Sequence, residues 1–188
     1  MQTYVGFLRA INVTGHATVR MRDLQQCFTA VGCRGVRSYI QSGNIVFEAA
    51  EEKAPALFRR IERTLRAEIG DDAVVLFRTA RALERIVQAN PFRELTADRA
   101  LKLCVTFLAA RPRGGVRLPR VSEKERLETI AMKNLDVFTV SRRKPNNFYG
   151  FPNNFVEKEL GVAGTSRNWS TVTRIVQLVR GRALGPRP

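Results

Sequence analysis

The sequence predicts an α+β protein built from two small domains, and three observations support that prediction. Strand-like and helix-like apolar patterns alternate along the first 80 residues, and a second series of such patterns begins near residue 101. The 188 residues are many for one small domain and enough for two. Hydrophobic residues make up 44% of the chain, which is sufficient for a real core.

The N-terminal domain begins with the order strand, helix, strand, strand. Residues 4–11 predict a strand that is apolar on both of its faces. A helix with a regular apolar stripe follows over residues 21–31, ended by a glycine. Two short strands at residues 36–40 and 45–47 then flank Gln41-Ser42-Gly43-Asn44, which is a hairpin signal.

A second helix and a fourth strand complete this domain. Pro55 begins the helix, and Gly70 ends it. Residues 73–77 predict a strand because they form a continuous apolar run. The resulting order β-α-β-β-α-β is the ferredoxin-like arrangement. We therefore predict a ferredoxin-like domain over residues 1–80.

The chain beyond this domain predicts a short connection and then a second small α+β domain. Residues 81–100 read as a short helix, capped by Thr79, followed by a linker. The second domain is expected over residues 101–188, beginning with a strand at 101–108. The spacing of Ser122 and Glu125 is that of a capping box and predicts a short helix. The further predicted elements are a hairpin around Asn134 with strands at 130–132 and 135–140, a third short strand at 148–151, a helix from Asn153 or Asn154, a last helix from Trp169 to Gly181, and a basic tail.

Targeting and membrane signals are not evident in the sequence. The segment MQTYVGFLRAINV has no basic leader, no long apolar run and no small-residue cleavage site. No apolar stretch approaches the ~20 residues that a membrane helix needs. We therefore expect a soluble, cytoplasmic protein without a membrane partner.

Cysteine and histidine usage argues against a metal centre. Cys27, Cys33 and Cys104 form no CxxC pair, and His16 is the single histidine of the chain. We expect reduced thiols and no metal site. The sequence also contains no nucleophile elbow, phosphate loop or dinucleotide fingerprint, so it assigns no cofactor and leaves enzyme status open.

Positive charge is the unusual bulk property of the chain. The net charge is +15, with an excess of +5 over residues 1–93 and +10 over residues 94–188. Such a field attracts polyanions through counterion release, which makes nucleic acid a candidate partner. The competing explanation is a solvated surface rich in arginine through genomic base composition.

Three sequence blocks resemble the signatures of one protein family. They are LRAINVTG at residues 8–15, SYIQSGNIVF at 38–47 and GTSRNWSTV at 164–172. These are similar to the LRGINVGG, YIxSGN and TxRNWxTV blocks of the bacterial domain-of-unknown-function family sixteen ninety-seven. The resemblance implies a two-part α+β fold with a ferredoxin-like N-terminal half, and it implies no activity.

The first two blocks are expected to meet in space. In a β-α-β-β-α-β sheet, the loop after strand one and the hairpin between strands two and three lie at the same end. Asn12 is therefore expected near Ser42 and Asn44. The alternative is purely structural, with Gly43 supplying the positive φ of a tight turn and Asn44 completing it.

The third block predicts an anion site. Thr165, Ser166, Arg167 and Asn168 precede and open the last predicted helix, where free N–H groups, hydroxyls and a guanidinium favour an anion. The alternative is a plain N-cap, with Arg167 bonded to a carboxylate or to carbonyl groups at the domain interface.

These observations give three functional hypotheses. The first is a protein that binds a phosphate- or carboxylate-bearing small molecule between its domains, through Asn12, Ser42, Asn44, Thr165, Ser166, Arg167 and Asn168. The second is non-specific nucleic-acid binding through the basic second half, without the exposed strand aromatics of an RNA-recognition module. The third is an interaction module without catalysis.

Overall fold

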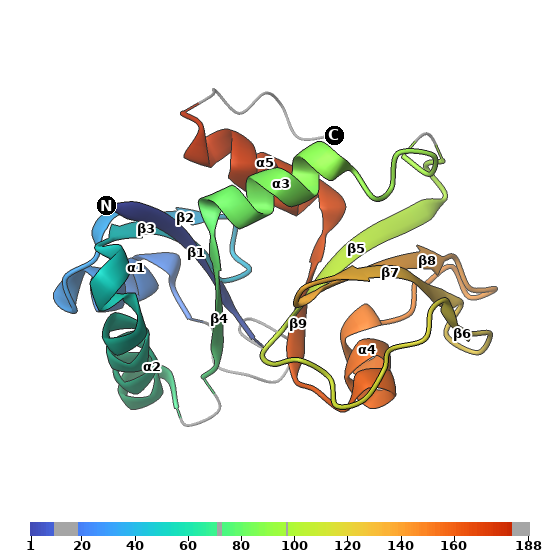
Figure 1. Ribbon diagram of the computed structural model, residues 1–188, viewed down its shortest axis with the longest axis horizontal. Coiled ribbons are helices and arrows are strands. Elements are labelled where there is room, and N and C mark those ends of the chain that lie inside the picture. Colours follow the sequence, from blue (N-terminus) through green and yellow to red (C-terminus); the bar gives the residue numbers. More distant parts are fainter. Residues whose placement is uncertain (10–18, 71–72, 97, 182–188) are drawn as a thin grey trace. The chain divides into compact units, whose positions relative to one another are not determined.

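A computed structural model describes residues 1–9, 19–70, 73–96 and 98–181 (Figure 1). The predicted site residue Asn12, His16 in the same loop and the basic tail lie outside these ranges. The protein has the predicted α+β composition, with two sheets whose strand pairs are all antiparallel. The chain divides into two compact units: Met1–Arg85 together with the chain from Ile175 onward, and Ile86–Arg174.

The first unit has the predicted order of elements. Its strands form one sheet in the order β2-β3-β1-β4. The elements are β1 (Gln2–Leu8), α1 (Met21–Ala30), β2 (Arg34–Tyr39), β3 (Asn44–Ala49), the 3-10 helix η1 (Glu51–Lys53), α2 (Ala54–Ile69) and β4 (Val75–Thr79). The helix α3 (Ala80–Ala89) follows directly and contains the boundary between the two units.

Apolar packing between one face of this sheet and the helices α1 and α2 forms the core of the first unit (Figure 1). β1 lies between β3 and β4, and its residues 4–8 are buried. The Phe47 ring at the centre has no exposed surface, and its centroid lies 5.2 Å from that of Phe28 on α1. Phe58 of α2 stacks on Phe77 of β4 at 4.0 Å between centroids.

The second unit contains a five-stranded sheet in the order β6-β7-β8-β5-β9. Its elements are β5 (Leu101–Leu108), β6 (Arg120–Ser122), β7 (Leu127–Lys133), β8 (Asp136–Arg142), α4 (Pro152–Leu160) and β9 (Gly164–Asn168), and α5 (Trp169–Val179) follows. The helix α4 covers one face of the sheet through Phe155, Val156 and Leu160, which pack against Leu108 and Leu127 (Figure 1).

Several predicted elements are confirmed, and two predictions in the second half are wrong. The hairpin around Asn134 is present, and that residue has a positive φ of 56°. The capping-box helix is absent: Ser122 Oγ does accept the Glu125 N–H at 3.3 Å, but the bond closes a turn between β6 and β7. Residues 148–151 form a loop and not a strand, because two asparagines turn the chain there. Residues 164–168, for which the sequence predicts no regular element, form the strand β9.

Within the described ranges, no helix combines the length and the apolar character that crossing a bilayer requires.

Candidate functional site

The strand β9 holds four of the predicted site residues, and its pairing with β5 determines how they point. Thr165 lies opposite Phe107, Arg167 opposite Val105 and Asn168 opposite Cys104. Because side chains alternate along a strand, Thr165 and Arg167 share one face, and Ser166 and Asn168 share the other. The four side chains therefore cannot all face one ligand, as an arrangement around a helix N-terminus would have allowed.

Arg167 is the charged group of this strand, and its surroundings are partly desolvated. Its Nη1 donates to Thr165 Oγ1 at 2.8 Å and to the Ser166 carbonyl oxygen at 2.9 Å. The residue as a whole is half-buried. Burial lowers the pKa of the guanidinium to about 10, so it remains a cation at neutral pH. The arrangement provides a fixed positive charge next to a buried hydroxyl.

Ser166 on the opposite face belongs to a polar network that joins β9 to its neighbours. Its hydroxyl lies 2.7 Å from that of Thr106 on β5 and 3.4 Å from Asn153 Oδ1 on α4. Glu157 Oε1 in turn accepts the backbone N–H of Gly164 at 2.7 Å and the Asn153 amide at 3.2 Å. These bonds attach α4 to the sheet, which is a structural role.

Asn168 lies on the same face as Ser166 and contacts a buried thiol. Its Oδ1 accepts the Cys104 Sγ–H at 3.7 Å. Burial raises the pKa of Cys104 to about 11, so the thiol stays protonated at neutral pH and is a poor nucleophile. Burial raises the pKa of Cys33 to about 11 as well, and that of Cys27 in the same direction.

The hairpin turn of the first unit holds the other described site residues. Asn44 is fully buried, and its Nδ2 donates to the Tyr39 carbonyl oxygen at 3.0 Å and to Ser42 Oγ at 2.8 Å. Gly43 has a φ of 67°, and its carbonyl oxygen accepts the Leu8 N–H at 2.8 Å. Asn44 thus completes the turn, and the turn lies beside the end of β1, as the topology predicted.

Hollows and metal-ligating groups add no further candidate in the first unit. A groove of about 530 Å³ between α1 and α2 is lined in part by Asp23, Cys27 and Glu68, and it contains none of the predicted site residues. Across the described ranges, no group of three or more histidine, cysteine, aspartate or glutamate side chains is placed to hold a metal ion.

Sequence reasoning missed the surface of the loop 143–151. Phe148 and Phe151 are 72% and 75% exposed, whereas a strand would have buried alternate residues. The signal that could have found them is the interleaving of arginine, lysine and aromatic residues in RRKPNNFYGF.

Comparison with known proteins gives the family from one match and the fold from another. A family model described as "Protein of unknown function (DUF1697)" matches residues 1–138. The structure of the conserved bacterial protein SP0830 from Streptococcus pneumoniae is similar, with a TM-score of 0.66 and 19% sequence identity over 95% of this chain and 98% of that one. At that identity the likeness concerns the fold alone. No curated protein matches the chain significantly.

Proposed function

The chain belongs to the DUF1697 family of proteins of unknown function, and from its own residues we propose that it binds an anionic small molecule bearing phosphate or carboxylate groups. Thr165 and Arg167 on one face of β9 are the residues that we assign to the anion. Ser166 and Asn168 point to the other face, so we assign them to the structure of the second unit.

The observation that supports this proposal is the desolvated guanidinium of Arg167. Removing a cation from water costs free energy, and the pKa lowered to about 10 reflects that cost. An anionic ligand within hydrogen-bond distance would add a favourable interaction with this cation. A guanidinium carries five N–H donors in a planar fork that fits phosphate or carboxylate oxygens. The bonds from Nη1 to Thr165 and Ser166 already orient this fork.

The first unit contributes a second part of the proposal. We assign Asn12 and Ser42 to the ligand as well, because Ser42 lies in the turn beside the end of β1, and Asn12 follows that strand in the sequence. The amide of Asn44 orients the Ser42 hydroxyl by donating to it. We also propose that this unit is ferredoxin-like, which its β-α-β-β-α-β order and its sheet order β2-β3-β1-β4 support.

The test is a ligand screen on three arginine variants. Thermal shift and calorimetry with inorganic phosphate, sulfate and a panel of phosphorylated and carboxylated metabolites would be run on wild type, Arg167→Ala and Arg167→Lys. Arg113→Ala is the matched control, because it removes the same charge from an exposed loop of the same unit. We expect loss of Arg167 to weaken binding about tenfold or more, with partial retention in the lysine variant.

Two further variants keep the test informative if Arg167→Ala fails to fold. Thr165→Val removes only the hydroxyl, and Ser42→Ala tests the first unit separately. Two outcomes would show that the proposal is wrong. One is that Arg113→Ala weakens ligand binding as much as Arg167→Ala and Arg167→Lys do. The other is that no variant changes the response to any ligand. Sulfate affinity should stay constant from pH 6 to 8, since Arg167 remains a cation over that range.

A further inference from the structure

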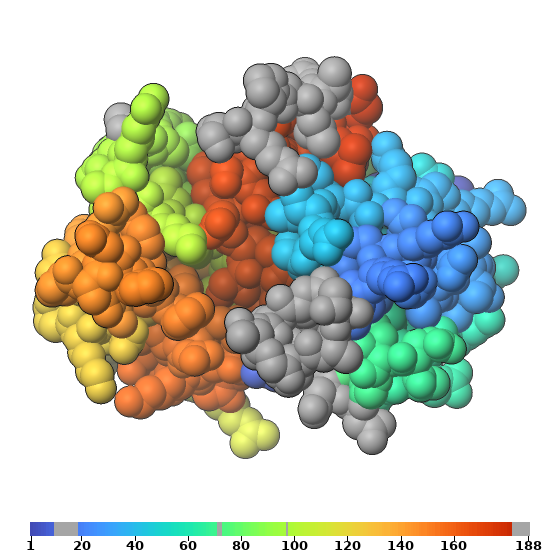
Figure 2. Space-filling model, turned by 180° about the vertical axis from the view of Figure 1, so that it is seen from behind, coloured from blue at the N-terminus to red at the C-terminus, as the bar shows by residue number. Residues whose placement is uncertain are grey.

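The loop between β8 and α4 carries two exposed phenylalanine rings, whereas the other aromatic residues of the protein are buried or half-buried. We call residues 143–151 the aromatic loop. Phe148 is 72% exposed and Phe151 is 75% exposed, while Phe47, Phe92 and Phe107 are fully buried. An exposed pair of large rings within four residues is typical of an interaction surface. In Figure 2 the orange segment that contains this loop lies uncovered on the face turned to the viewer.

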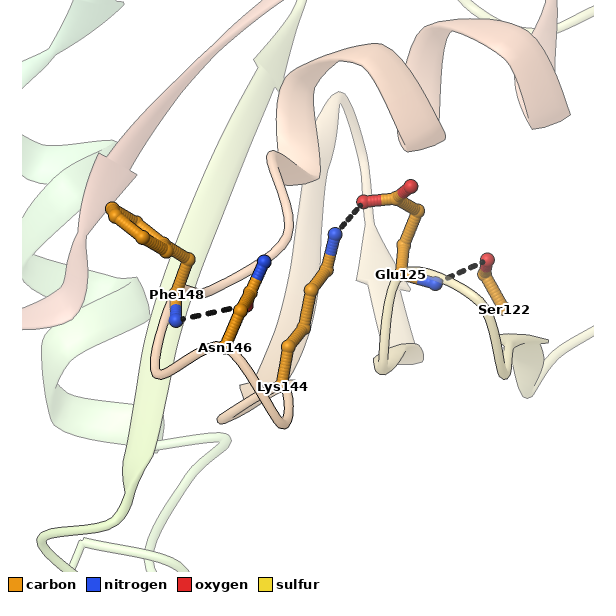
Figure 3. Close-up of polar contacts among 5 residues, drawn as sticks. All are labelled: Ser122, Glu125, Lys144, Asn146 and Phe148. Atoms are coloured by element: carbon orange, nitrogen blue, oxygen red, sulfur yellow. Dashed lines mark hydrogen bonds and ion pairs between the residues drawn. The ribbon is translucent and has the colours of Figure 1, made fainter.

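Hydrogen bonds hold the aromatic loop in one conformation. The Lys144 N–H donates to the Phe148 carbonyl oxygen at 2.8 Å, and the Phe148 N–H donates to Asn146 Oδ1 at 3.2 Å. Lys144 Nζ forms an ion pair with Glu125 at 2.6 Å, and the Glu125 N–H donates to Ser122 Oγ. Figure 3 shows the last three of these bonds, with the Phe148 ring pointing away from the Lys144–Glu125 pair. The rings are therefore presented on a preorganised support, which lowers the entropy cost of binding.

Steric packing fixes the base of the loop as well. A Cβ atom at Gly150 would collide with the carbonyl oxygen of Glu125 and would lie 3.0 Å from Leu127 Cγ. Tyr149, the third aromatic residue, donates its hydroxyl to the Ala100 carbonyl oxygen at 3.0 Å. This bond ties the ring of Tyr149, which follows Phe148 in the sequence, to the backbone just before β5.

Two cations lie next to the ring of Tyr149 in the aromatic loop. Lys102 Nζ lies 5.6 Å and Arg143 Cζ 5.7 Å from the centroid of the Tyr149 ring. Both residues are exposed, and neither forms an ion pair within the described part of the chain. The neighbouring Arg142 differs, because it pairs with Glu128 at 3.0 Å.

We propose that the aromatic loop, together with Lys102 and Arg143, is a docking surface for single-stranded nucleic acid. Exposed phenyl rings stack with unpaired bases of any sequence, and adjacent cations bind the phosphates. The net charge of +15 favours the approach of a polyanion. A duplex keeps its bases stacked on one another and offers no base face to Phe148 or Phe151, so the surface should prefer single strands.

Alternative partners fit these observations less well. An acidic peptide would use Lys102 and Arg143 but would leave both phenyl rings without a planar partner. The surface also uses none of the residues assigned above to the small anion, so the two proposals can fail independently.

The first test removes the rings. Binding of fluorescein-labelled 12-nucleotide oligo(dT) and oligo(U) to the full chain would be measured by anisotropy for wild type, Phe148→Ala, Phe151→Ala and the double variant. Val121→Ala, which trims a side chain 56% exposed in the same unit, is the control. We expect each ring removed to weaken binding at least about fivefold, with the control unchanged.

The second test removes the cations. Salt titrations would compare Lys102→Gln/Arg143→Gln with Arg113→Gln/Arg117→Gln, a pair of exposed arginines that carries the same charge change. For single strands, the slope of log affinity against log salt should fall by about 0.7 for each phosphate that the protein no longer neutralises, or about 1.4 for the first pair. The control pair should leave the slope nearly unchanged.

Four outcomes would overturn the proposal. The first is equal affinity of wild type and the ring variants for both oligonucleotides. The second is equal loss of affinity in the two cation pairs, which would indicate diffuse charge. A duplex of the same length that binds as tightly as the single strand would be the third. The last is displacement of the oligonucleotide by poly-glutamate at an equal concentration of charge, which would assign the surface to an acidic protein partner.

Discussion

The two units stabilise their sheets in different ways. Among the described residues, the first unit buries one polar side chain, that of Asn44, beneath or within its sheet and helices. The second unit buries seven, which are Thr106, Thr129, Asp136, Thr139, Ser141, Thr165 and Thr171. The helices α1 and α2 therefore rest on an apolar, aromatic layer, while α4 rests on a sheet face that is partly polar.

The polar side chains of the second unit are arranged in register across its strands. Thr129, Thr139, Cys104 and Asn168 are successive cross-strand partners on β7, β8, β5 and β9. The two threonine hydroxyls lie 3.4 Å apart, and the thiol donates to Asn168. A buried hydrogen bond adds little net free energy to folding, but a buried polar group left without its partner costs much. Such a sheet face therefore specifies the register of the strands more than it adds stability.

Removing an aromatic ring from the core of the first unit should give the largest loss of stability. Phe47→Ala is expected to destabilise the protein by about 3–5 kcal/mol, because it removes a fully buried ring and leaves a cavity. Urea unfolding followed by circular dichroism measures the change. Phe148→Ala is the matched control, since the same substitution at a ring 72% exposed should cost less than about 0.5 kcal/mol. Similar losses of stability in both variants would refute the apolar account of the first unit.

The one polar side chain that is buried among the described residues of the first unit should give the next largest effect. Asn44→Ala removes the donors to the Tyr39 carbonyl oxygen and to Ser42 Oγ and is expected to cost about 1–3 kcal/mol. Ser42→Ala should cost less, because its side chain is only half-buried. Equal stability of the two variants in the same unfolding assay would show that the Asn44 amide does not hold the hairpin turn.

The smallest effects should come from two hydroxyl groups of the second unit, one that forms a hydrogen bond and one that does not. Thr106→Val removes the 2.7 Å bond to Ser166 and should cost about 1 kcal/mol. Ser141→Ala should be neutral or slightly stabilising, because its hydroxyl is fully buried and has no hydrogen-bond partner within the described chain. Thermal melts of both variants measure the difference. A larger loss of stability from Ser141→Ala would mean that an ordered water or another group satisfies that hydroxyl.

The candidate site separates into parts that local sequence could predict and parts that it could not. Gly43 and Asn44 form a turn signal of their own, and the structure has them in a tight turn with the expected bonds. The sequence predicts that residues 165–168 precede the last helix, which does begin at Trp169. The backbone groups of these residues nevertheless pair with β5, some 60 residues earlier in the chain, and no local pattern contains that information. A common ligand for the two sets of residues stays a prediction.

Local chemistry determined the elements whose signals lie within a few residues: the helices with an apolar stripe, the apolar strand β1 and the turns at Gly43 and Asn134. Only the tertiary structure decided that β9 is a strand, that its side chains alternate between a desolvated cation and a polar network, and that Phe148 and Phe151 face solvent. The physical reason is that strand pairing and burial depend on partners distant in the sequence, whereas helix periodicity and turn geometry depend on neighbours.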